Sequence, residues 1–120
     1  MASILIVDDS VSMRSMVSTT LSTSGYTVVD ASDGQDGLNK AKGQQFDVII
    51  SDINMPKMNG IELVKALRAL PNYKYTPILL LTTESSNDKK LEGKQAGATG
   101  WLVKPFNPEK LIATVQRVFK

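Results

Sequence analysis

Side chains that could do chemistry come directly after four short apolar runs of the sequence. They are Asp8, Asp9, Asp52, Thr82 and Lys104. Carboxylates, a hydroxyl and an ammonium group together can bind a hard metal ion and a phosphoryl group. Carboxylates that lie ~5 Å apart at an effective dielectric of about 20 repel one another by roughly 3 kcal/mol per pair. If the three aspartates meet, they therefore require a cation.

The sequence contains no cysteine and no histidine, which narrows the chemistry further. These absences exclude disulfides, thiolate zinc sites, iron–sulfur clusters, cysteine nucleophiles, Ser-His-Asp triads and a histidine phosphodonor within the chain. A metal must then have oxygen ligands, and two carboxylates plus a carbonyl with retained waters suit Mg²⁺ best. Beside such a metal, a lysine and a hydroxyl, an aspartate can itself be the nucleophile and form an acyl phosphate.

Charge and hydropathy exclude several other classes of protein. The 14 basic and 12 acidic residues give a net charge of +2, which indicates neither a nucleic acid nor an anionic membrane as partner. The longest apolar runs have four residues, too short for a membrane span, and no signal peptide is visible. We therefore expect a cytoplasmic protein without membrane insertion, and the length of 120 residues predicts one domain, 1–120.

The elements that must position these side chains alternate between strands and helices. Apolar runs rich in β-branched residues predict strands at 3–7, 26–31, 48–51, 78–81 and 100–103, with helical spacing between them. Predicted N-caps of the helices are Ser10, Asp33, Asn59, Asn87 or Asp88, and Asn107. The fourth helix has Gly93 in its middle and little apolar surface beyond Leu91 and Ala96, so we expect it to be the most mobile.

Five strands alternating with five helices predict an α/β fold of the doubly wound (βα)₅ type. Near-continuous apolar strands are typical of a parallel sheet covered on both faces. Ligands of such sheets bind beyond the carboxyl ends of the strands. The five side chains named first should therefore meet at one edge of the sheet.

Four segments resemble the signature motifs of response-regulator receiver domains in two-component signalling. They are ILIVDDS (4–10), DVIISDINMPKMNGIEL (47–63), PILLLTTES (77–85) and AGATGWLVKPF (96–106), and together they extend over essentially the whole chain. Among receivers, the chain is most similar to the stand-alone chemotaxis regulators. The resemblance implies a flavodoxin-like sheet of strand order 2-1-3-4-5 and a single receiver domain without an output domain.

The resemblance also implies roles for the residues of the site. Asp52 would be the phosphoacceptor, with a CheA-like histidine kinase as phosphodonor. Asp9, Asp52 and the backbone carbonyl of Asn54 would bind Mg²⁺, or Mn²⁺ as a substitute. Asp8 would hold a metal-bound water.

Further residues would respond to the phosphoryl group. Lys104, joined to Pro105 by a cis peptide, would pair with a phosphoryl oxygen. Thr82 would hydrogen-bond the phosphoryl group and move toward it, and Trp101 would turn inward as the aromatic switch residue. Asn54 and Glu84 would tune dephosphorylation, and both match the chemotaxis type, so we expect comparatively fast loss of phosphate.

The implied function is that of a monomeric signalling phosphoacceptor whose only catalysis is its own phosphorylation and dephosphorylation. The face of the fourth helix, fifth strand and fifth helix would bind a downstream protein such as the flagellar motor switch, and a phosphatase is a further candidate partner. Ile53, Thr83 and Lys90 depart from the best-known motor-binding regulator. A phosphate sink, or an adapter in a non-flagellar chemosensory or pilus pathway, therefore remains an alternative.

Two other classes with the same strand layout fit the sequence less well. A haloacid-dehalogenase-type phosphatase requires a second aspartate two residues after the nucleophile, where this chain has Asn54. A flavodoxin requires a phosphate-binding loop after the first strand, where Asp8 and Asp9 would repel the FMN phosphate.

Overall fold

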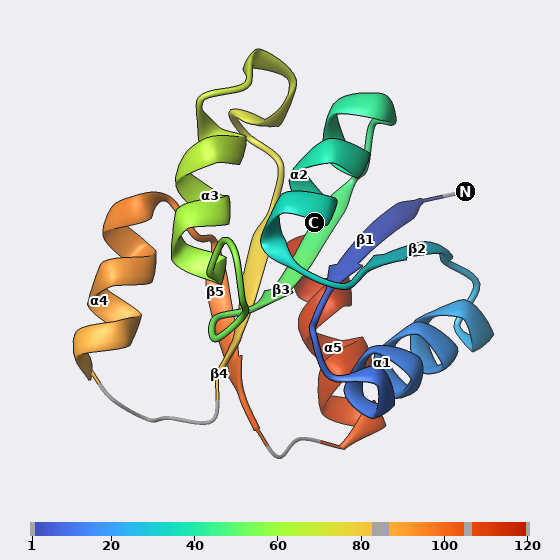
Figure 1. Cartoon of the computed structure of the whole chain (residues 1–120). Coiled ribbons are helices and arrows are strands. Elements are labelled where there is room, and N and C mark those ends of the chain that lie inside the picture. Colours follow the sequence, from blue (N-terminus) through green and yellow to red (C-terminus); the bar gives the residue numbers. More distant parts are fainter. Residues whose placement is uncertain (1, 83–86, 105–106, 120) are drawn as a thin grey trace.

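The computed structural model describes residues 2–82, 87–104 and 107–119, which form one parallel sheet with helices on both faces (Figure 1). In chain order the elements are β1 (Ser3–Val7), α1 (Val11–Thr23), β2 (Thr27–Ala31), α2 (Gly34–Gly43), β3 (Val48–Asp52), α3 (Gly60–Arg68), the 3₁₀ turn η1 (Pro71–Tyr73), β4 (Ile78–Thr82), α4 (Asn87–Ala96), β5 (Gly100–Val103) and α5 (Pro108–Val118). The sheet order is β2-β1-β3-β4-β5. The predicted fold class and strand order are confirmed.

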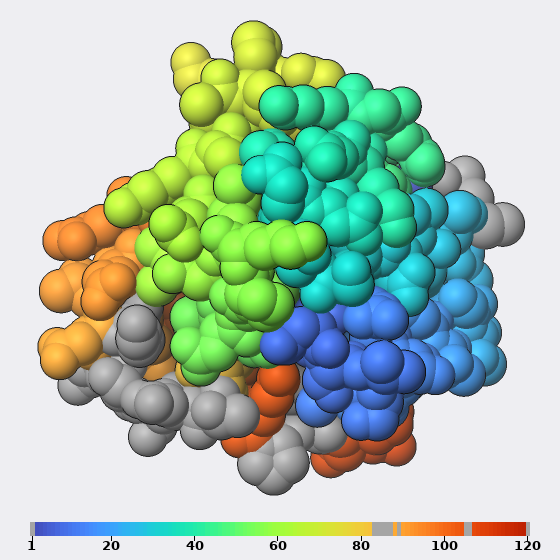
Figure 2. Space-filling model, in the orientation of Figure 1, coloured from blue at the N-terminus to red at the C-terminus, as the bar shows by residue number. Residues whose placement is uncertain are grey.

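Alternate residues of the central strands build two separate hydrophobic layers. Ile4, Ile6 and Leu79 face α1 and α5, whereas Leu5 and Ile49 face α2 and α3. Each layer removes apolar side chains from water, which is the main driving force for this fold. Atoms of α2 and α3 meet over the sheet and cover it on the side shown in Figure 2. No helix among the described residues is long and apolar enough to cross a membrane.

Local capping signals fix where most of the helices begin. The side chains of Ser10, Asp33, Asn59 and Asn107 each accept a hydrogen bond from a backbone amide three residues later, as predicted. The predicted cap of the fourth helix is wrong, because α4 already includes both candidate residues, Asn87 and Asp88. Two strands also extend one residue further than predicted, since Asp52 and Thr82 still pair with neighbouring strands.

Helix α4 attaches to the molecule through small residues. Gly93 is buried against Leu80, and a β-carbon at Gly93 would lie 2.8 Å from a methyl carbon of Leu80. Leu91, which we expected to be part of the apolar surface of this helix, is 55% exposed. Gly93 thus allows close packing of α4 on the sheet, a role that its low helix propensity does not reveal. The expectation that α4 is the most mobile helix stays a prediction.

The C-terminal end of α4 is held by Arg68 at the end of α3. The Arg68 guanidinium donates to the carbonyl of Gly97 at 3.0 Å and to those of Tyr73 and Thr76 at 2.7 Å each. Gly97 itself has φ +112°, a conformation that favours glycine, and it ends α4. One guanidinium therefore ties α3, the turn before β4 and the end of α4 together.

Candidate metal and phosphoryl site

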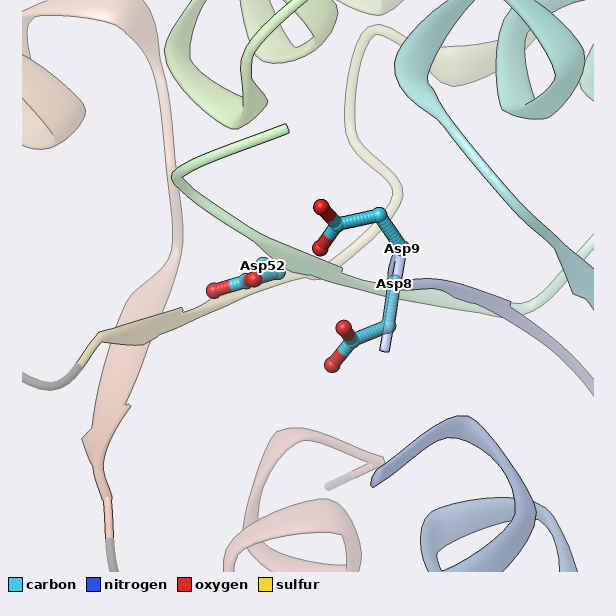
Figure 3. A group of neighbouring side chains, drawn as sticks. All are labelled: Asp8, Asp9 and Asp52. Carbon is cyan, nitrogen blue, oxygen red and sulfur yellow. The ribbon is translucent and has the colours of Figure 1, made fainter. Parts of the chain in front are cut away.

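The three predicted acidic residues meet at the carboxyl ends of β1 and β3 (Figure 3). The register pairs Val7 with Ser51, so the residues that follow, Asp8 and Asp52, lie beside each other. One carboxylate oxygen from each of Asp8, Asp9 and Asp52 lies within 4.8 Å of the other two. Asp8 and Asp52 are buried and Asp9 is exposed. The cluster therefore has two buried members and one side open to solvent.

Lys104 provides the positive charge of the site from the end of β5. Its Nζ lies 3.3 Å from Oδ1 of Asp52 and 3.7 Å from Oδ2 of Asp8, and its side chain is 12% exposed. The Lys104 amide also donates to the carbonyl of Thr82 at 2.7 Å, which continues the β4–β5 pairing. The ammonium pairs with two of the three carboxylates, so the site keeps an excess of negative charge.

The Asp8 carboxylate indicates what would neutralise this excess. Its Oδ1 accepts a hydrogen bond from the Ser10 amide at 2.9 Å, whereas its buried Oδ2 accepts none among the described residues. A buried anionic oxygen without a hydrogen bond is costly. A hard divalent cation, or water bound to one, would satisfy it, and an all-oxygen donor set suits Mg²⁺ or Mn²⁺. These residues therefore fit the metal that the sequence predicted.

Burial governs the proton affinity of Asp52. It raises the pKa of the Asp52 carboxyl above its usual range, and the negative charge of Asp8 raises the pKa further. The Lys104 ammonium and the hydrogen bond from the Ile53 amide act in the opposite direction and lower the pKa. A bound cation would also favour the carboxylate form. Since only the carboxylate is nucleophilic, a cation would favour the reactive state of Asp52.

The loop that follows β3 folds back over Asp52. The Gly60 amide donates to the carbonyl of Ile53 at 2.8 Å, and a β-carbon at Gly60 would lie 2.2 Å from the carbonyl oxygen of Asp52. Only glycine fits this approach, so Gly60 shapes the site although it carries no functional group. Asn54 lies in this loop and is exposed, two residues after Asp52. Its role as a carbonyl ligand stays a prediction.

The model of the family described as response regulator receiver domain matches residues 4–116. This chain belongs to that family. Chemotaxis protein CheY of Pseudomonas aeruginosa is 38% identical over 118 residues, which cover 98% of this chain and 95% of that protein. The predicted resemblance to receiver domains is therefore confirmed.

Solved structures agree with this assignment. Chemotaxis protein CheY4 of Vibrio cholerae is 63% identical with a TM-score of 0.96, and the match covers 98% of each chain. The receiver domain of a Pseudomonas aeruginosa sensor histidine kinase is 29% identical with a TM-score of 0.90, covering 97% of this chain and 95% of that one. That structure has a magnesium ion coordinated in its active-site cleft. Receiver domains are signalling phosphoacceptors, and this one is of the CheY type.

Two further predicted residues of this receiver lie on neighbouring strands. Leu80 of β4 pairs with Trp101 of β5, and Thr82 pairs with Val103. Residues two apart on a strand share a face, so Thr82 and Trp101 lie on the same face of the sheet. Thr82 is buried, whereas Trp101 is half-buried with the Nζ of Lys90 5.6 Å from its ring centroid. Their proposed coupling as a switch stays a prediction.

Some predicted residues cannot be placed, and one structural contributor was missed. Thr83, Glu84 and Pro105 lie outside the described residues, and so does the predicted cis peptide. No role was predicted for Gly60, although this glycine directly follows the helix cap Asn59 and lies eight residues after Asp52. A glycine directly after a cap and close to a candidate nucleophile is a signal that could have identified it.

Proposed function

We propose that this receiver takes a phosphoryl group from a CheA-like histidine kinase onto Asp52 and then signals by binding a downstream protein. The observation that carries the proposal is the Asp52 carboxylate, which lies at the sheet edge with the Lys104 ammonium 3.3 Å away. An Asp52 oxygen would attack the phosphorus, the P–N bond to the donor histidine would break, and the imidazole would leave. An acyl phosphate would result.

The residues around Asp52 would have different roles in this phosphoryl transfer. Asp9, Asp52 and the carbonyl of Asn54 would hold Mg²⁺ or Mn²⁺, and Asp8 would orient a water on the ion. The ion supplies charge neutralisation for the phosphoryl oxygens. Lys104 would pair with one phosphoryl oxygen, and this pairing would replace part of its present contact with Asp8.

Phosphorylation would then change the face formed by α4, β5 and α5. The added group carries about −1.5 to −2 charges. A Thr82 hydroxyl that moves to donate to it would vacate space on the face that it shares with Trp101. A single charge-assisted hydrogen bond contributes about 1.5–3 kcal/mol, enough to invert a preference of ~1–2 kcal/mol between two conformations. Asn54 and Glu84 would set how fast the phosphoryl group is lost.

We further propose a chemotaxis role in the cytoplasm as a monomer, which is supported by the likeness to CheY and CheY4. The flagellar motor switch is the first candidate target. The Lys90 ammonium near the Trp101 ring favours a second function, because it places a cation on the proposed docking face. In that second function the receiver is an adapter or phosphate sink of a non-flagellar pathway.

Two experiments test these proposals. Incubation with acetyl phosphate and Mg²⁺ should add one phosphoryl group by intact mass, and omission of Mg²⁺ or the substitution Asp52→Asn should abolish it. Undiminished phosphorylation of Asp52→Asn would refute Asp52 as acceptor. Affinity capture with the beryllofluoride-bound protein then identifies the target: motor-switch protein supports the first function, and a pilus or kinase component without motor-switch protein supports the second.

A further inference from the structure

The Asp9 carboxylate takes part in the acidic cluster without a side-chain partner of its own. It lies within 4.8 Å of the other two acids, yet within the described part of the chain it makes no hydrogen bond or ion pair. It is also exposed, so packing does not fix it. Its direction therefore depends on the backbone that carries it, and above all on the peptide that joins it to Asp8.

That peptide is held by Arg14 of α1. The Nη1 of Arg14 donates to the backbone carbonyl of Asp8 at 2.8 Å. The Arg14 amide donates to the carbonyl of Ser10 at 2.9 Å, so the arginine backbone lies in the first turn of α1. On the other side of the turn, the Ser10 amide donates to Oδ1 of Asp8. The turn between β1 and α1 is thus fixed at both of its sides.

Arg14 is in turn held by an acid at the edge of the sheet. Its Nε donates to Oδ2 of Asp30 at 3.1 Å, and the arginine side chain is only 19% exposed. The Asp30 backbone accepts a further hydrogen bond from Lys40 of α2. A planar guanidinium can bind a carbonyl and a carboxylate at once in fixed directions, whereas a lysine ammonium cannot reproduce this geometry.

We infer that Arg14 is a positioning residue of the metal site: by fixing the peptide between Asp8 and Asp9, it aims the Asp9 carboxylate at the cation. The inference rests on the proposed function only in that it assumes Mg²⁺ binds at the acidic cluster. The hydrogen bonds of Arg14 go to the Asp8 carbonyl and to Asp30, and not to Asp52. Arg14 therefore acts on metal affinity and not on the phosphoryl transfer itself.

Arg14→Lys is the decisive variant, because it keeps the positive charge and removes the planar guanidinium that binds the Asp8 carbonyl and Asp30 at once. Mg²⁺ affinity measured by titration calorimetry should fall about tenfold, the lower end of the effect of residues that orient metal ligands. Asp30→Asn should weaken Mg²⁺ binding less, by about threefold, because Arg14 keeps its hydrogen bond to the Asp8 carbonyl and loses only the ion pair with Asp30. Arg117→Lys is the matched control, since Arg117 is exposed on α5 and should leave the affinity unchanged.

A second readout separates positioning from general damage to the fold. In Arg14→Lys, the Mg²⁺ concentration that half-saturates the rate of phosphorylation by acetyl phosphate should rise by the same factor as the dissociation constant. The rate at saturating Mg²⁺ should stay within about twofold, because Arg14 does not contact Asp52. A lowered rate at saturation with unchanged half-saturation would overturn the inference.

The outcomes distinguish the inference from the proposed function. A folded Arg14→Lys with Mg²⁺ affinity within about twofold of the parent refutes the role of Arg14 alone. If Arg14→Lys does not fold, Asp30→Asn decides in the same way: an unchanged affinity refutes the inference. A parent protein that binds Mg²⁺ but is not phosphorylated refutes the proposed function alone, and the calorimetric comparison still tests Arg14. A parent that binds no Mg²⁺ refutes both.

Discussion

Replacing Asp8 by asparagine should make the metal-free protein more stable while it impairs the site. At an effective dielectric of about 20, Asp8 and Asp52 at up to 4.8 Å repel by at least ~3.5 kcal/mol, and Asp8 and Lys104 at 3.7 Å attract by ~4.5 kcal/mol. Asp9 is exposed, so its repulsion of Asp8 is screened to about 1 kcal/mol. The pairwise charge interactions of Asp8 therefore nearly cancel.

The buried Oδ2 of Asp8 decides whether Asp8→Asn raises or lowers the free energy of unfolding. As an anionic oxygen without a hydrogen bond it costs more than a neutral amide in the same position, by about 1–2 kcal/mol. Asp8→Asn should therefore gain about 1–2 kcal/mol in free energy of unfolding when Mg²⁺ is chelated. Saturating Mg²⁺ should stabilise the parent strongly and the variant little, so the order of the two stabilities reverses.

Urea unfolding with EDTA and with Mg²⁺ measures both halves of this prediction. Glu92→Gln is the control, because it is the same acid-to-amide change on an exposed position of α4 and should shift stability by less than about 0.5 kcal/mol. If Asp8→Asn is less stable than the parent by more than about 1 kcal/mol in EDTA, the attraction of Lys104 outweighs repulsion and burial, and the reasoning is refuted.

Three more predictions follow from the same geometry. Because the pKa of Asp52 is raised, its protonated form is favoured by folding: metal-free stability should fall as the pH rises from about 4 through the raised pKa, and calorimetric Mg²⁺ affinity should weaken as the pH is lowered through it. A pH-independent affinity would contradict this. Gly60→Ala would place a β-carbon 2.2 Å from the carbonyl oxygen of Asp52 and should cost about 2–4 kcal/mol in urea unfolding, whereas Gly43→Ala meets nothing within 4 Å and should cost nothing. Equal stabilities of the two variants would count against the close approach. Lys90→Met should remove a cation–π contact of about 0.5 kcal/mol and change the emission of Trp101, the only tryptophan, while Lys94→Met on exposed α4 should not. Identical spectra for the two variants would be evidence that Lys90 does not lie over the ring in solution.

The features that the sequence predicted correctly depend on local signals. Apolar runs of at most four residues mark strands, and Asn or Asp before an amphipathic stretch marks a helix start, as at Asn59 and Asn107. The order of these elements then places Asp8 and Asp52 at one edge, because the carboxyl ends of parallel strands meet there. Both conclusions need only neighbouring residues and general rules of chain connection.

The features that escaped prediction depend on partners distant in sequence. Arg68 bonds to the carbonyl of Gly97, 29 residues away, and an arginine on a helix gives no sign of such a contact. Gly93 has a low helix propensity, and the sequence does not show that it packs closely against Leu80. The final residues of two predicted strands, Asp52 and Thr82, were missed because the apolar pattern stops before the strand pairing does.

Arg68 binds the carbonyl of Gly97 and so holds the C-terminal end of α4. We therefore expect any tilt of this helix to pivot at Gly97. The helix has ten residues and so measures about 15 Å, and a tilt of ~10° about a fixed C-terminal end displaces its first turn by roughly 3 Å. The last turn would scarcely move. A protein that docks near Asp88 would therefore sense a far larger displacement than one that docks near Ala96, and amide hydrogen exchange should grow slower along α4 toward its fixed end.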